Sequence, residues 1–353
     1  MKGIILHGGH GTRLRPLTHT GPKQLLPIAN KPMSQFCLEA ISETGITDIA
    51  IIIGGVGSNK VKDYYGNGEK FGVNITYVEQ DKPRGIAHAI RLCKEFINNE
   101  KFLVFLGDNI IQKTITEFTQ NFKKSDHDAT ILLCEVDDPS RFGIADVENG
   151  KILKISEKPK NPVSNLAVTG IYLLTPKIFD IIDDLKPSWR NELEITDALQ
   201  LLLEKNNNIS YETITDYWKD TGTPNDIINA NAQILAQIKP VLDGTCEENV
   251  SLDGSLSLGK NSIIKSDVTI HGPVIIGKNC VIESNTSIGP NTSIGDNTII
   301  SSCNIKDSII MSDCQIYGKF IIENSIISSN SQIKSDDKNS KIFLLGEGSR
   351  ILL

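Results

Sequence analysis

The sequence lacks the features of a secreted, disulfide-linked or membrane-spanning protein. Its seven cysteines are an odd number and none forms a C-x-x-C pair, which argues against a disulfide framework and a zinc cluster. No apolar run is long enough to cross a bilayer, and the first six residues lead directly into glycines rather than into a signal-peptide core. We therefore expect a cytoplasmic protein with no membrane partner.

The excess of basic charge that is typical of nucleic-acid-binding proteins is also absent. The 353 residues carry a formal net charge of −7, which argues against a broad surface for nucleic acid but not against a local pocket for a polyphosphate. The composition, 39% hydrophobic and 22% charged, is ordinary for a globular protein long enough for two domains. We expect no nucleic-acid partner, and small anionic substrates stay open.

Residues 1–240 alternate β-branched apolar runs with amphipathic segments, which is typical of an α/β domain with a largely parallel sheet. The expected strands are residues 2–6, 48–53, 74–78, 102–106, 129–136 and 168–174. Apolar residues have helical spacing at residues 35–43, 87–97 and 115–123. The Asn149-Gly150 pair indicates a tight hairpin turn between two further strands at residues 144–147 and 152–155.

Beyond residue 240 the pattern changes to a six-residue repeat. Aliphatic residues occupy every sixth position from Leu252 to Ile300, and a column of mostly small or β-branched residues runs two positions before them. A helix cannot keep such a column on one face, whereas a triangular solenoid with about 18 residues per turn can. Glycines and asparagines between the columns would form its corners. We predict a left-handed parallel β-helix over residues 241–353, irregular after Cys303, with residues 342–353 as a candidate closing cap.

The strongest local motif is LHGGHGTRL at residues 6–14, directly after the first expected strand. Its glycines let backbone N–H groups approach a phosphate chain, and the guanidinium of Arg13 adds further donors. The motif is neither a P-loop nor a Rossmann fingerprint. RPLT, PKQLLP and NKP follow it closely and add a second cation, Lys23. This combination predicts a binding loop for a polyphosphate.

Two aspartates are candidate metal ligands. The apolar run at residues 102–106 delivers Asp108 to the carboxyl end of a strand, where open α/β sheets form ligand sites. Asp220, within WKDTG, supplies a second carboxylate. Two carboxylates and phosphate oxygens suit Mg²⁺. We therefore predict Asp108 and Asp220 as Mg²⁺ ligands; an aspartate that only caps a turn is the structural alternative for Asp108.

Together these motifs resemble the signature of the sugar nucleotidyltransferases. The pattern GGxGTRLxPxT followed by PKxLLP and NKP is highly specific, and the likeness continues through Gln80, PRGIAHA (83–89), LGDN (106–109), EKP (157–159), WRNELEITD (189–197) and WKDTG (218–222). With its β-helix, the whole chain looks like the long form of the glucose-1-phosphate thymidylyltransferases. This resemblance implies a Rossmann-like α/β nucleotidyltransferase domain with a mainly parallel mixed sheet at residues 1–240, followed by the hexapeptide-repeat domain at residues 241–353.

The resemblance also implies roles for individual residues. Gln80 and Gly85 would read the base, Glu157 would bind sugar hydroxyls, and Lys158 would bind the phosphate of the sugar phosphate. The implied nucleotide-binding residues are Leu6, Gly8, Gly9, Gly11, Thr12, Arg13, Gln80, Pro83, Gly85 and Asp108; the sugar-phosphate residues are Gly143, Glu157, Lys158 and Val168; the catalytic residues are Arg13, Lys23, Asp108 and Lys158. His7 departs from the family, which more often has a small residue there.

The implied reaction transfers a nucleotidyl group from a nucleoside triphosphate, dTTP favoured, to a sugar 1-phosphate, glucose 1-phosphate favoured, and releases pyrophosphate. Both reactants are anions, so Mg²⁺, Arg13, Lys23 and Lys158 would act by charge compensation and positioning, without a covalent intermediate. UTP stays open because uracil and thymine differ by one methyl group.

Two further functions stay open. β-helices of this kind recur in acyltransferases that use a histidine base, and His271 is the only histidine after Pro240; a bifunctional enzyme with acetyltransferase activity is therefore one alternative. A non-catalytic regulatory subunit is the other, although the retention of Arg13 and Asp108 argues against it. The flat faces of a β-helix suit self-association, so we expect a homo-oligomer.

Overall fold

The computed structural model describes residues 1–9, 11–335 and 340–352. Contacts within the chain form two compact units, one of Met1–His10 and Met33–Asp220, the other of Gly11–Pro32 and Thr221–Leu353. These units group residues by packing, whereas the predicted boundary at residue 240 divides a catalytic from a repeat domain. That boundary stays a prediction, and each unit is described by itself.

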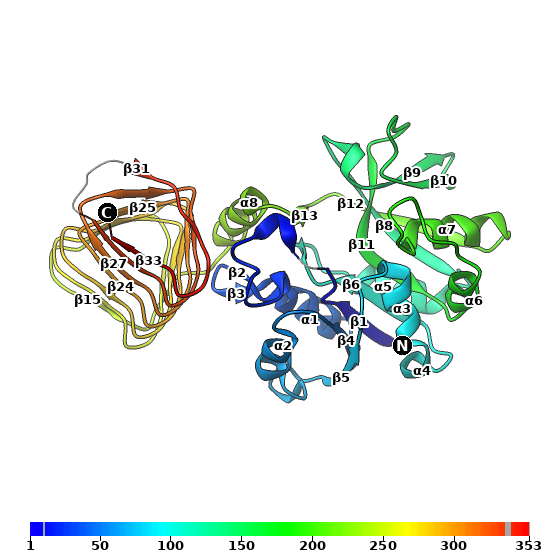
Figure 1. The fold of residues 1–353 in the computed structure, drawn as a ribbon, viewed down its shortest axis with the longest axis horizontal. Coiled ribbons are helices and arrows are strands. Elements are labelled where there is room, and N and C mark those ends of the chain that lie inside the picture. Colours follow the sequence, from blue (N-terminus) through cyan, green and yellow to red (C-terminus); the bar gives the residue numbers. More distant parts are fainter. Residues whose placement is uncertain (10, 336–339, 353) are drawn as a thin grey trace. The chain divides into compact units, whose positions relative to one another are not determined.

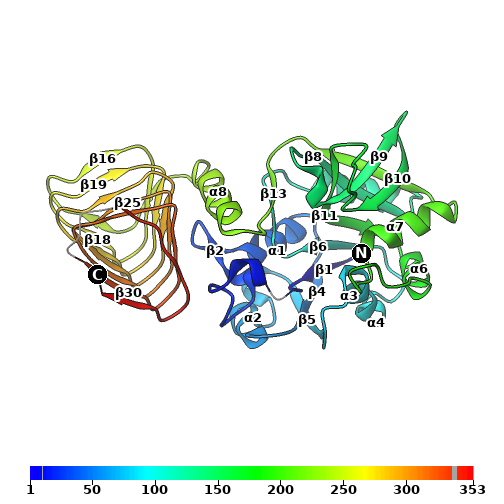
Figure 2. The same cartoon turned by 45° about the horizontal axis from the view of Figure 1, so that its top comes forward.

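The first unit is built on one mixed sheet (Figures 1 and 2). Its parallel part runs in the order β6 (Phe102–Leu106), β1 (Lys2–Leu6), β4 (Asp48–Ile53) and β5 (Asn74–Glu79). Beyond β6 the pairing becomes antiparallel through β11 (Leu166–Leu174), β9 (Gly143–Glu148) and β10 (Lys151–Glu157), while β8 (Ala129–Glu135) pairs with β11 and with β12 (Ile209–Ile214). The predicted Rossmann-like mixed sheet is confirmed.

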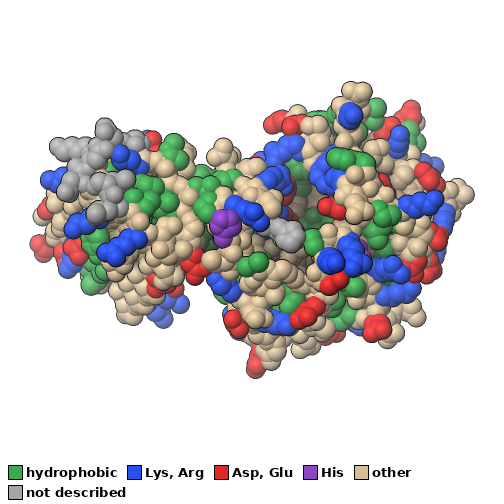
Figure 3. Space-filling model, viewed as in Figure 1, with side chains coloured by type: hydrophobic (Ala, Val, Ile, Leu, Met, Phe, Trp, Pro, Cys, Tyr) green, Lys and Arg blue, Asp and Glu red, His purple; other side chains and the backbone are tan. Residues whose placement is uncertain are grey.

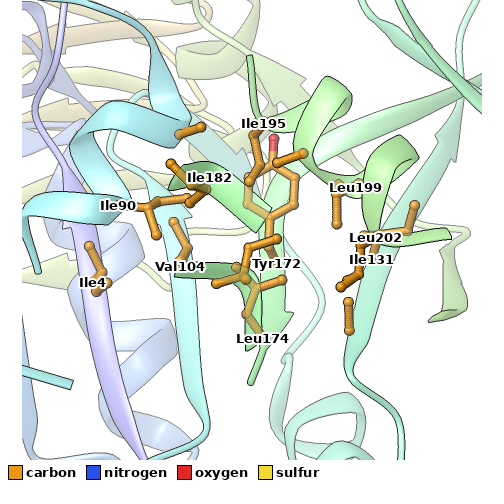
Figure 4. Close-up of a cluster of buried hydrophobic side chains, with 14 of the residues drawn as sticks. Ile4, Ile90, Val104, Ile131, Tyr172, Leu174, Ile182, Ile195, Leu199 and Leu202 are labelled. Atoms are coloured by element: carbon orange, nitrogen blue, oxygen red, sulfur yellow. The ribbon is translucent and has the colours of Figure 1, made fainter. Parts of the chain in front are cut away.

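Helices pack on both faces of this sheet. Side chains alternate between the two faces along each strand, so the apolar strands present apolar side chains to both faces. Gly3 faces α1 (Met33–Glu43) so closely that a Cβ there would lie 3.0 Å from Ile41. The neighbouring Ile4 belongs instead to the large core on the other face, which Figure 4 shows. That core includes residues of α3 (Ile86–Leu92), α6 (Lys177–Asp183) and α7 (Ile195–Glu204).

The predicted elements agree with the structure where apolar runs are continuous. The strands at residues 2–6, 48–53 and 102–106 have the predicted bounds, and the three others shift by one or two residues. The Asn149-Gly150 turn is confirmed by φ values of 50° and 76°. The helix predicted at residues 87–97 is divided at Cys93 into α3 and α4 (Lys94–Ile97), and α5 spans Thr116–Lys124. The apolar patterns do not predict several other elements, among them α2 (Ser58–Tyr65), α6, α7 and β12.

In the second unit, the described residues from Val241 onward form a left-handed parallel β-helix, as predicted. Three parallel sheets of seven, seven and six strands take every third strand of the chain, beginning with β14 (Val241–Leu242), β15 (Thr245–Cys246) and β16 (Ser251–Asp253). The aliphatic column from Leu258 to Ile333 fills the interior. The corner asparagines have positive φ: Asn261, Asn279, Asn285, Asn291 and Asn297 lie between 55° and 61°.

The two ends of the β-helix depart from the prediction. Leu252, the first residue of the predicted interior column, is 47% exposed because its strand is the terminal one of its sheet and is covered on one side only. The candidate cap continues the coils instead, since β32 (Leu344–Leu345) and β33 (Arg350–Leu352) pair with the preceding coil. Leu353 lies outside the described residues. Among those that are described, no helix is both long and apolar enough to cross a membrane.

The second unit also contains α8 (Pro224–Leu235) and the short hairpin of β2 (Pro27–Ile28) and β3 (Lys31–Pro32). Both cartoon views show α8 beside this hairpin (Figures 1 and 2). Thr223 caps the helix by accepting a hydrogen bond from the Asp226 N–H at 3.3 Å, and Pro224 occupies its first turn.

Candidate active site

The first cluster of predicted residues lies at the carboxyl ends of β1 and β6. The buried Leu6 accepts a hydrogen bond from the Gly107 N–H at 3.0 Å through its carbonyl oxygen, so the two strand ends remain adjacent. Gly8, two residues after Leu6, lies beside the side chain of Gln80. If position 8 carried a Cβ atom, that atom would lie 3.7 Å from Gln80 Oε1. Position 8 therefore lies within van der Waals contact distance of the amide predicted to read the base.

The orientation of Gln80 is fixed by His88 of α3. The Gln80 side chain is 8% exposed, and its Nε2 lies 3.0 Å from His88 Nδ1. Burial, followed by the positive charge of Arg84, lowers the pKa of His88, which favours a neutral ring that accepts at Nδ1. Gln80 thus donates to His88 and turns its carbonyl oxygen toward Gly8. His88 lies in the PRGIAHA motif, but the motif by itself assigns no role to the histidine.

Gly85 is required by a close approach of two backbones. Its φ of 105° is one that side chains rarely adopt, and a Cβ there would overlap the carbonyl oxygen of Leu193. Leu193 donates to the Arg84 carbonyl at 2.8 Å and accepts from the Ala87 N–H at 3.0 Å. The exposed Pro83 precedes this junction. The PRG motif is therefore tied to the segment that carries WRNELEITD.

The two predicted metal ligands lie on adjoining strands. Asp108 precedes β7 (Asn109–Ile111), which pairs antiparallel with β13 (Trp218–Asp220) so that Asp220 is the register partner of Asn109. Asn109 donates to Asp108 at 3.1 Å and accepts from the buried Trp218 indole at 2.8 Å. Trp218 therefore braces the pair of strands that bears both carboxylates.

These carboxylates fit a magnesium ion better than a structural metal. Mg²⁺ is usually held by one or two carboxylates and completes its octahedron with water and substrate phosphates. Asp108 and Asp220 meet that description. Within the described part of the chain, no group of three or more His, Cys, Asp or Glu residues could form a closed metal cage.

A second cluster unites all four predicted sugar-phosphate residues. A Cβ at Gly143 would lie 3.3 Å from Glu157 Oε2 and 3.7 Å from Val168 Cβ, so only glycine leaves room beside the carboxylate. Lys158 has a positive φ of 41°, and its ammonium lies 3.6 Å from Glu157 Oε1. The N–H of Lys158 donates to Phe142 at 3.0 Å, which holds this turn against β9.

Two residues of the WRNELEITD motif complete this second cluster, although the motif alone assigns neither of them an individual role. Arg190 lies 3.2 Å from Glu157 Oε1, and Thr196 donates to Glu157 Oε2 at 2.9 Å. Arg190 also binds Glu194 at 2.7 Å. Burial raises the pKa of the neighbouring Asp197, and the negative charges of Glu194 and Glu157 raise it further.

The pKa of one buried tyrosine is affected by carboxylates of both clusters. Tyr172 lies on β11, which pairs with β6, and is 3% exposed. Burial raises the pKa of its phenol, and the charges of Glu157 and Asp108 raise it further. Because Coulomb effects fall off with distance, Glu157 and Asp108 both lie in the neighbourhood of Tyr172 in the first unit.

Four further predicted residues belong to the second unit. Gly11 has a φ of 58° and its carbonyl accepts from Thr18 Oγ1 at 2.8 Å, while Lys23 Cβ would lie 3.4 Å from a Cβ at position 11. Thr12 and Arg13 follow in an exposed 3₁₀ turn. The segment thus folds back on itself and brings the Arg13 turn and Lys23 together.

Gly9 and His7 flank the start of the loop. Gly9 has a φ of 90° with open space at its Cβ position. His7 is buried in the first unit, and neither ring nitrogen has a hydrogen-bond partner among the described residues. Burial lowers the pKa of His7 to about 3, against a smaller opposing effect of Asp108. The imidazole is therefore neutral and packs edge-on to Tyr65, with ring centroids 6.1 Å apart.

His271, the residue behind the acetyltransferase alternative, lies on β19 (Thr269–His271) at the surface. Its Nδ1 is 3.8 Å from Asp253 Oδ2 on the preceding coil. The alternative stays open to assay. On the molecular face in Figure 3, Lys and Arg side chains are interspersed with Asp and Glu.

Comparison with known proteins agrees with this geometry. A family model described as nucleotidyl transferase matches residues 2–237, and one described as the GMPPB C-terminal domain matches residues 270–352. The low-salt glycan biosynthesis nucleotidyltransferase Agl11 of Haloferax volcanii is 41% identical over 100% of both chains. A glucose-1-phosphate thymidylyltransferase of Streptomyces antibioticus is 39% identical over 99% of both.

A solved structure resembles part of the chain. It is a Bacillus anthracis protein assigned as a glucose-1-phosphate thymidylyltransferase and solved in complex with sucrose; it is 43% identical, has a TM-score of 0.64, and matches 69% of this chain and 98% of its own. The match to the family model over residues 2–237 and the full-length relatives together show the family. The chain belongs to the nucleotidyl transferase family and is a sugar nucleotidyltransferase.

Proposed function

We propose that this enzyme transfers the thymidylyl group of dTTP to glucose 1-phosphate, forming dTDP-glucose and pyrophosphate with Mg²⁺ as cofactor. The observation that carries the reaction type is the pairing of Asp220 with Asn109 beside Asp108, which gives two carboxylates on adjoining strands. The choice of substrates is supported by the Streptomyces antibioticus relative, which is similar over 99% of both chains.

In the proposed reaction, a phosphate oxygen of glucose 1-phosphate attacks the α-phosphorus of dTTP in line. The new P–O bond forms as the bond from the α-phosphorus to the oxygen that bridges the α- and β-phosphorus breaks, and that oxygen leaves with its electron pair as a terminal oxygen of pyrophosphate. Mg²⁺, when bound by Asp108 and Asp220, would neutralise negative charge on the phosphate oxygens. No covalent intermediate is needed, so the protein acts by positioning and electrostatics.

The remaining roles in the proposal follow the two clusters. Gln80 offers its carbonyl oxygen beside Gly8, which suits the N3–H of thymine or uracil. Glu157, held by Arg190 and Thr196, accepts hydrogen bonds from sugar hydroxyls, and Lys158 neutralises the sugar phosphate. Arg13 and Lys23 compensate the charge of the triphosphate, with Leu6, Gly9, Gly11, Thr12, Pro83 and Gly85 shaping the nucleotide site.

The proposal extends to the setting of the enzyme. Residues 1–240 form the catalytic domain, and residues 241–353 form an assembly domain in a homo-oligomer. All seven cysteines are free thiols, six of them buried, which suits the reducing cytoplasm. Neither nucleic acid nor membrane is a partner in this proposal.

The first experiment is pyrophosphate release with Mg²⁺ across dTTP, UTP, GTP, ATP and CTP, each paired with glucose, mannose, glucosamine and N-acetylglucosamine 1-phosphates. The highest kcat/KM is expected for dTTP with glucose 1-phosphate. A clear preference for another pair would overturn the substrates but keep the reaction. Silence across every pair would favour the regulatory subunit, and a parallel assay with acetyl-coenzyme A and glucosamine 1-phosphate tests the bifunctional alternative.

Asp108→Asn tests the reaction type itself. The change keeps size and shape but removes a charge that Mg²⁺ requires, so turnover should fall by about a thousandfold or more, while thermal unfolding stays near that of the wild type. The matched control is Asp138→Asn, an exposed aspartate that caps a 3₁₀ turn. Near-normal turnover of Asp108→Asn would contradict the assignment.

A further inference from the structure

One asparagine of α8 is fully buried and makes three hydrogen bonds. Asn231 has 0% exposure. Its Oδ1 accepts from the Ala29 N–H at 2.8 Å and from Ser293 Oγ at 3.0 Å. Its Nδ2 donates to the Asn291 carbonyl at 3.0 Å. Both acceptor positions of the amide oxygen are thus used, which is the satisfaction that a buried polar side chain needs.

The first partner of Asn231 lies in the turn between β2 and β3. Ala29 and Asn30 have positive φ values of 48° and 62°. Positive φ is uncommon for any residue with a side chain, and surrounding contacts must hold it. Asn231 supplies one such contact at Ala29. Asn30 supplies another, since its Nδ2 donates to the Ile294 carbonyl at 2.6 Å.

The other partners lie on one coil of the β-helix. Ser293 is the middle residue of β23 (Thr292–Ile294), and its register partners on the neighbouring coils are Ile275 and Ile309. Ser293 has 0% exposure, so its hydroxyl would be costly there without a partner. A serine in a mainly apolar column is explained by its hydrogen bond to Asn231.

A second contact joins the same N-terminal segment to the end of the β-helix. A Cβ at Gly346 would lie 3.3 Å from the Pro16 carbonyl oxygen, so this glycine packs directly against Pro16. The segment Gly11–Pro32 is therefore held at two points by residues of the solenoid and α8. It packs with the second unit rather than with the strand that precedes it.

We infer that the β-helix acts as a positioning element for the triphosphate-binding segment, with Asn231 as the positioning residue. The inference rests on the proposed function, because Arg13 and Lys23 lie in the segment that Asn231 and Ser293 hold. The hydrogen bond from the Ala29 N–H to Asn231 fixes one end of this segment, and the hydrogen bond from Thr18 Oγ1 to the Gly11 carbonyl fixes the fold between Arg13 and Lys23. We call the hydrogen bonds of Asn231 with Ala29, Ser293 and Asn291 the clamp. Removing bonds of this clamp should weaken binding of the triphosphate but not of the sugar phosphate.

The test uses three full-length variants, of which two each remove one hydrogen bond of Asn231 and the third removes all three. Ser293→Ala removes one hydrogen bond with almost no change in volume. Asn231→Asp keeps the acceptor for Ala29 and Ser293 but loses the donor to Asn291, and Asn231→Ala loses all three bonds. The matched control is Ser257→Ala, in the same column two coils earlier and partly exposed.

The expected result is a split between the two substrates. The KM for dTTP should rise about fivefold in Ser293→Ala and at least about tenfold in Asn231→Ala, while the KM for glucose 1-phosphate changes by less than about twofold. Ser257→Ala should behave as wild type. Unchanged KM values in all variants, or an equal rise for both substrates, would overturn the inference.

Hydrogen exchange tests the clamp independently of turnover. Amides of residues 12–32 should exchange faster in Ser293→Ala and Asn231→Ala than in Ser257→Ala, whereas those of β6 should not change. If the wild type shows no turnover, the proposed function fails while this measurement still decides on the clamp. If turnover is normal and exchange in residues 12–32 is unaltered, the clamp is overturned and the function stands.

Discussion

Glu157 shows how one carboxylate is held in a single orientation and remains available to a ligand. Arg190 binds its Oε1 and Thr196 donates to its Oε2, so both oxygens are anchored from the same motif. Each carboxylate oxygen can accept about two hydrogen bonds, which leaves capacity for sugar hydroxyls. Arg190 is itself fixed by Glu194. A planar guanidinium that bridges two carboxylates cannot be replaced by a point charge.

Arg190→Lys should therefore impair use of the sugar phosphate. Lysine retains the charge but cannot bridge Glu157 and Glu194, so the KM for glucose 1-phosphate should rise about tenfold with little change in the KM for dTTP. Steady-state kinetics with each substrate varied in turn give both values. Arg91→Lys, in an exposed pair with Asp183 at 2.7 Å, is the matched control. An unchanged KM for the sugar phosphate would refute the role of Arg190.

His7 makes stability depend on pH. Burial lowers its pKa to about 3 from an ordinary 6.5, so below pH 6.5 the unfolded chain binds a proton that the folded chain does not. Stability from this group is complete above pH 6.5 and is lost as pH falls toward 3. Between pH 6.5 and 4.5 the loss is about 2 kcal/mol, because one pKa unit corresponds to about 1.4 kcal/mol.

Urea unfolding at pH 6.5 and pH 4.5 measures this loss. The decrease in unfolding free energy should be smaller by about 2 kcal/mol in His7→Ala than in the wild type, even if His7→Ala is less stable at both pH values. The exposed His19→Ala should keep the wild-type decrease. An equal decrease in His7→Ala and wild type would show that His7 does not titrate in this way.

At the scale of elements, the sequence predicts the strands and coils that form through residues close together in the chain. The strands β1, β4 and β6 are continuous apolar runs buried on both faces, and their bounds were predictable. The six-residue period predicted the β-helix because each coil repeats the same packing. The pairing of β7 with β13 joins residues about 110 positions apart in three-residue strands, and no periodicity marks it. The hydrogen bonds of Asn231 were equally unpredictable, because their partners are distant in sequence.

A corner glycine of the β-helix, Gly289, is more constrained by its surroundings than Gly150 in the hairpin turn between β9 and β10. Gly289 has a φ of 117°, and a Cβ there would overlap the carbonyl oxygen of His271 on the preceding coil. Gly289→Ala should therefore destabilise the second unit by about 3 kcal/mol or more. Gly150→Ala, at a φ of 76° with open space around it, should cost only about 1 kcal/mol. Calorimetry of both variants compares their melting temperatures, and a smaller shift for Gly289→Ala would contradict the close packing of these coils.

At the scale of the whole molecule, the sequence shows a sharp boundary near residue 240 between the nucleotidyltransferase motifs and the six-residue repeat. The packing of the chain does not follow this boundary. The loop that carries Arg13 is continuous in sequence with β1, yet Gly11–Pro32 packs with α8 and the β-helix. Motif resemblance predicted the grouping of Gly143, Glu157, Lys158 and Val168, which the structure brings together. It could not predict which unit would hold Gly11–Pro32, since that depends on contacts between residues far apart in sequence, such as the hydrogen bonds from Ala29 to Asn231 and from Asn30 to Ile294.

The first coil of the β-helix, which no further coil covers, offers a surface through which two copies of the protein can associate. Leu242 and Leu252 of the first coil are 59% and 47% exposed, although the equivalent positions of later coils are buried. Apolar side chains gathered at one end of a solenoid favour a self-complementary contact with a second copy. Sedimentation of the wild type should show an oligomer, and the double variant Leu242→Ser/Leu252→Ser should shift it toward monomer. Leu153→Ser, 51% exposed on β10, is the control that should leave it intact. A monomeric wild type, or an oligomer that survives the double variant, would exclude association through this end.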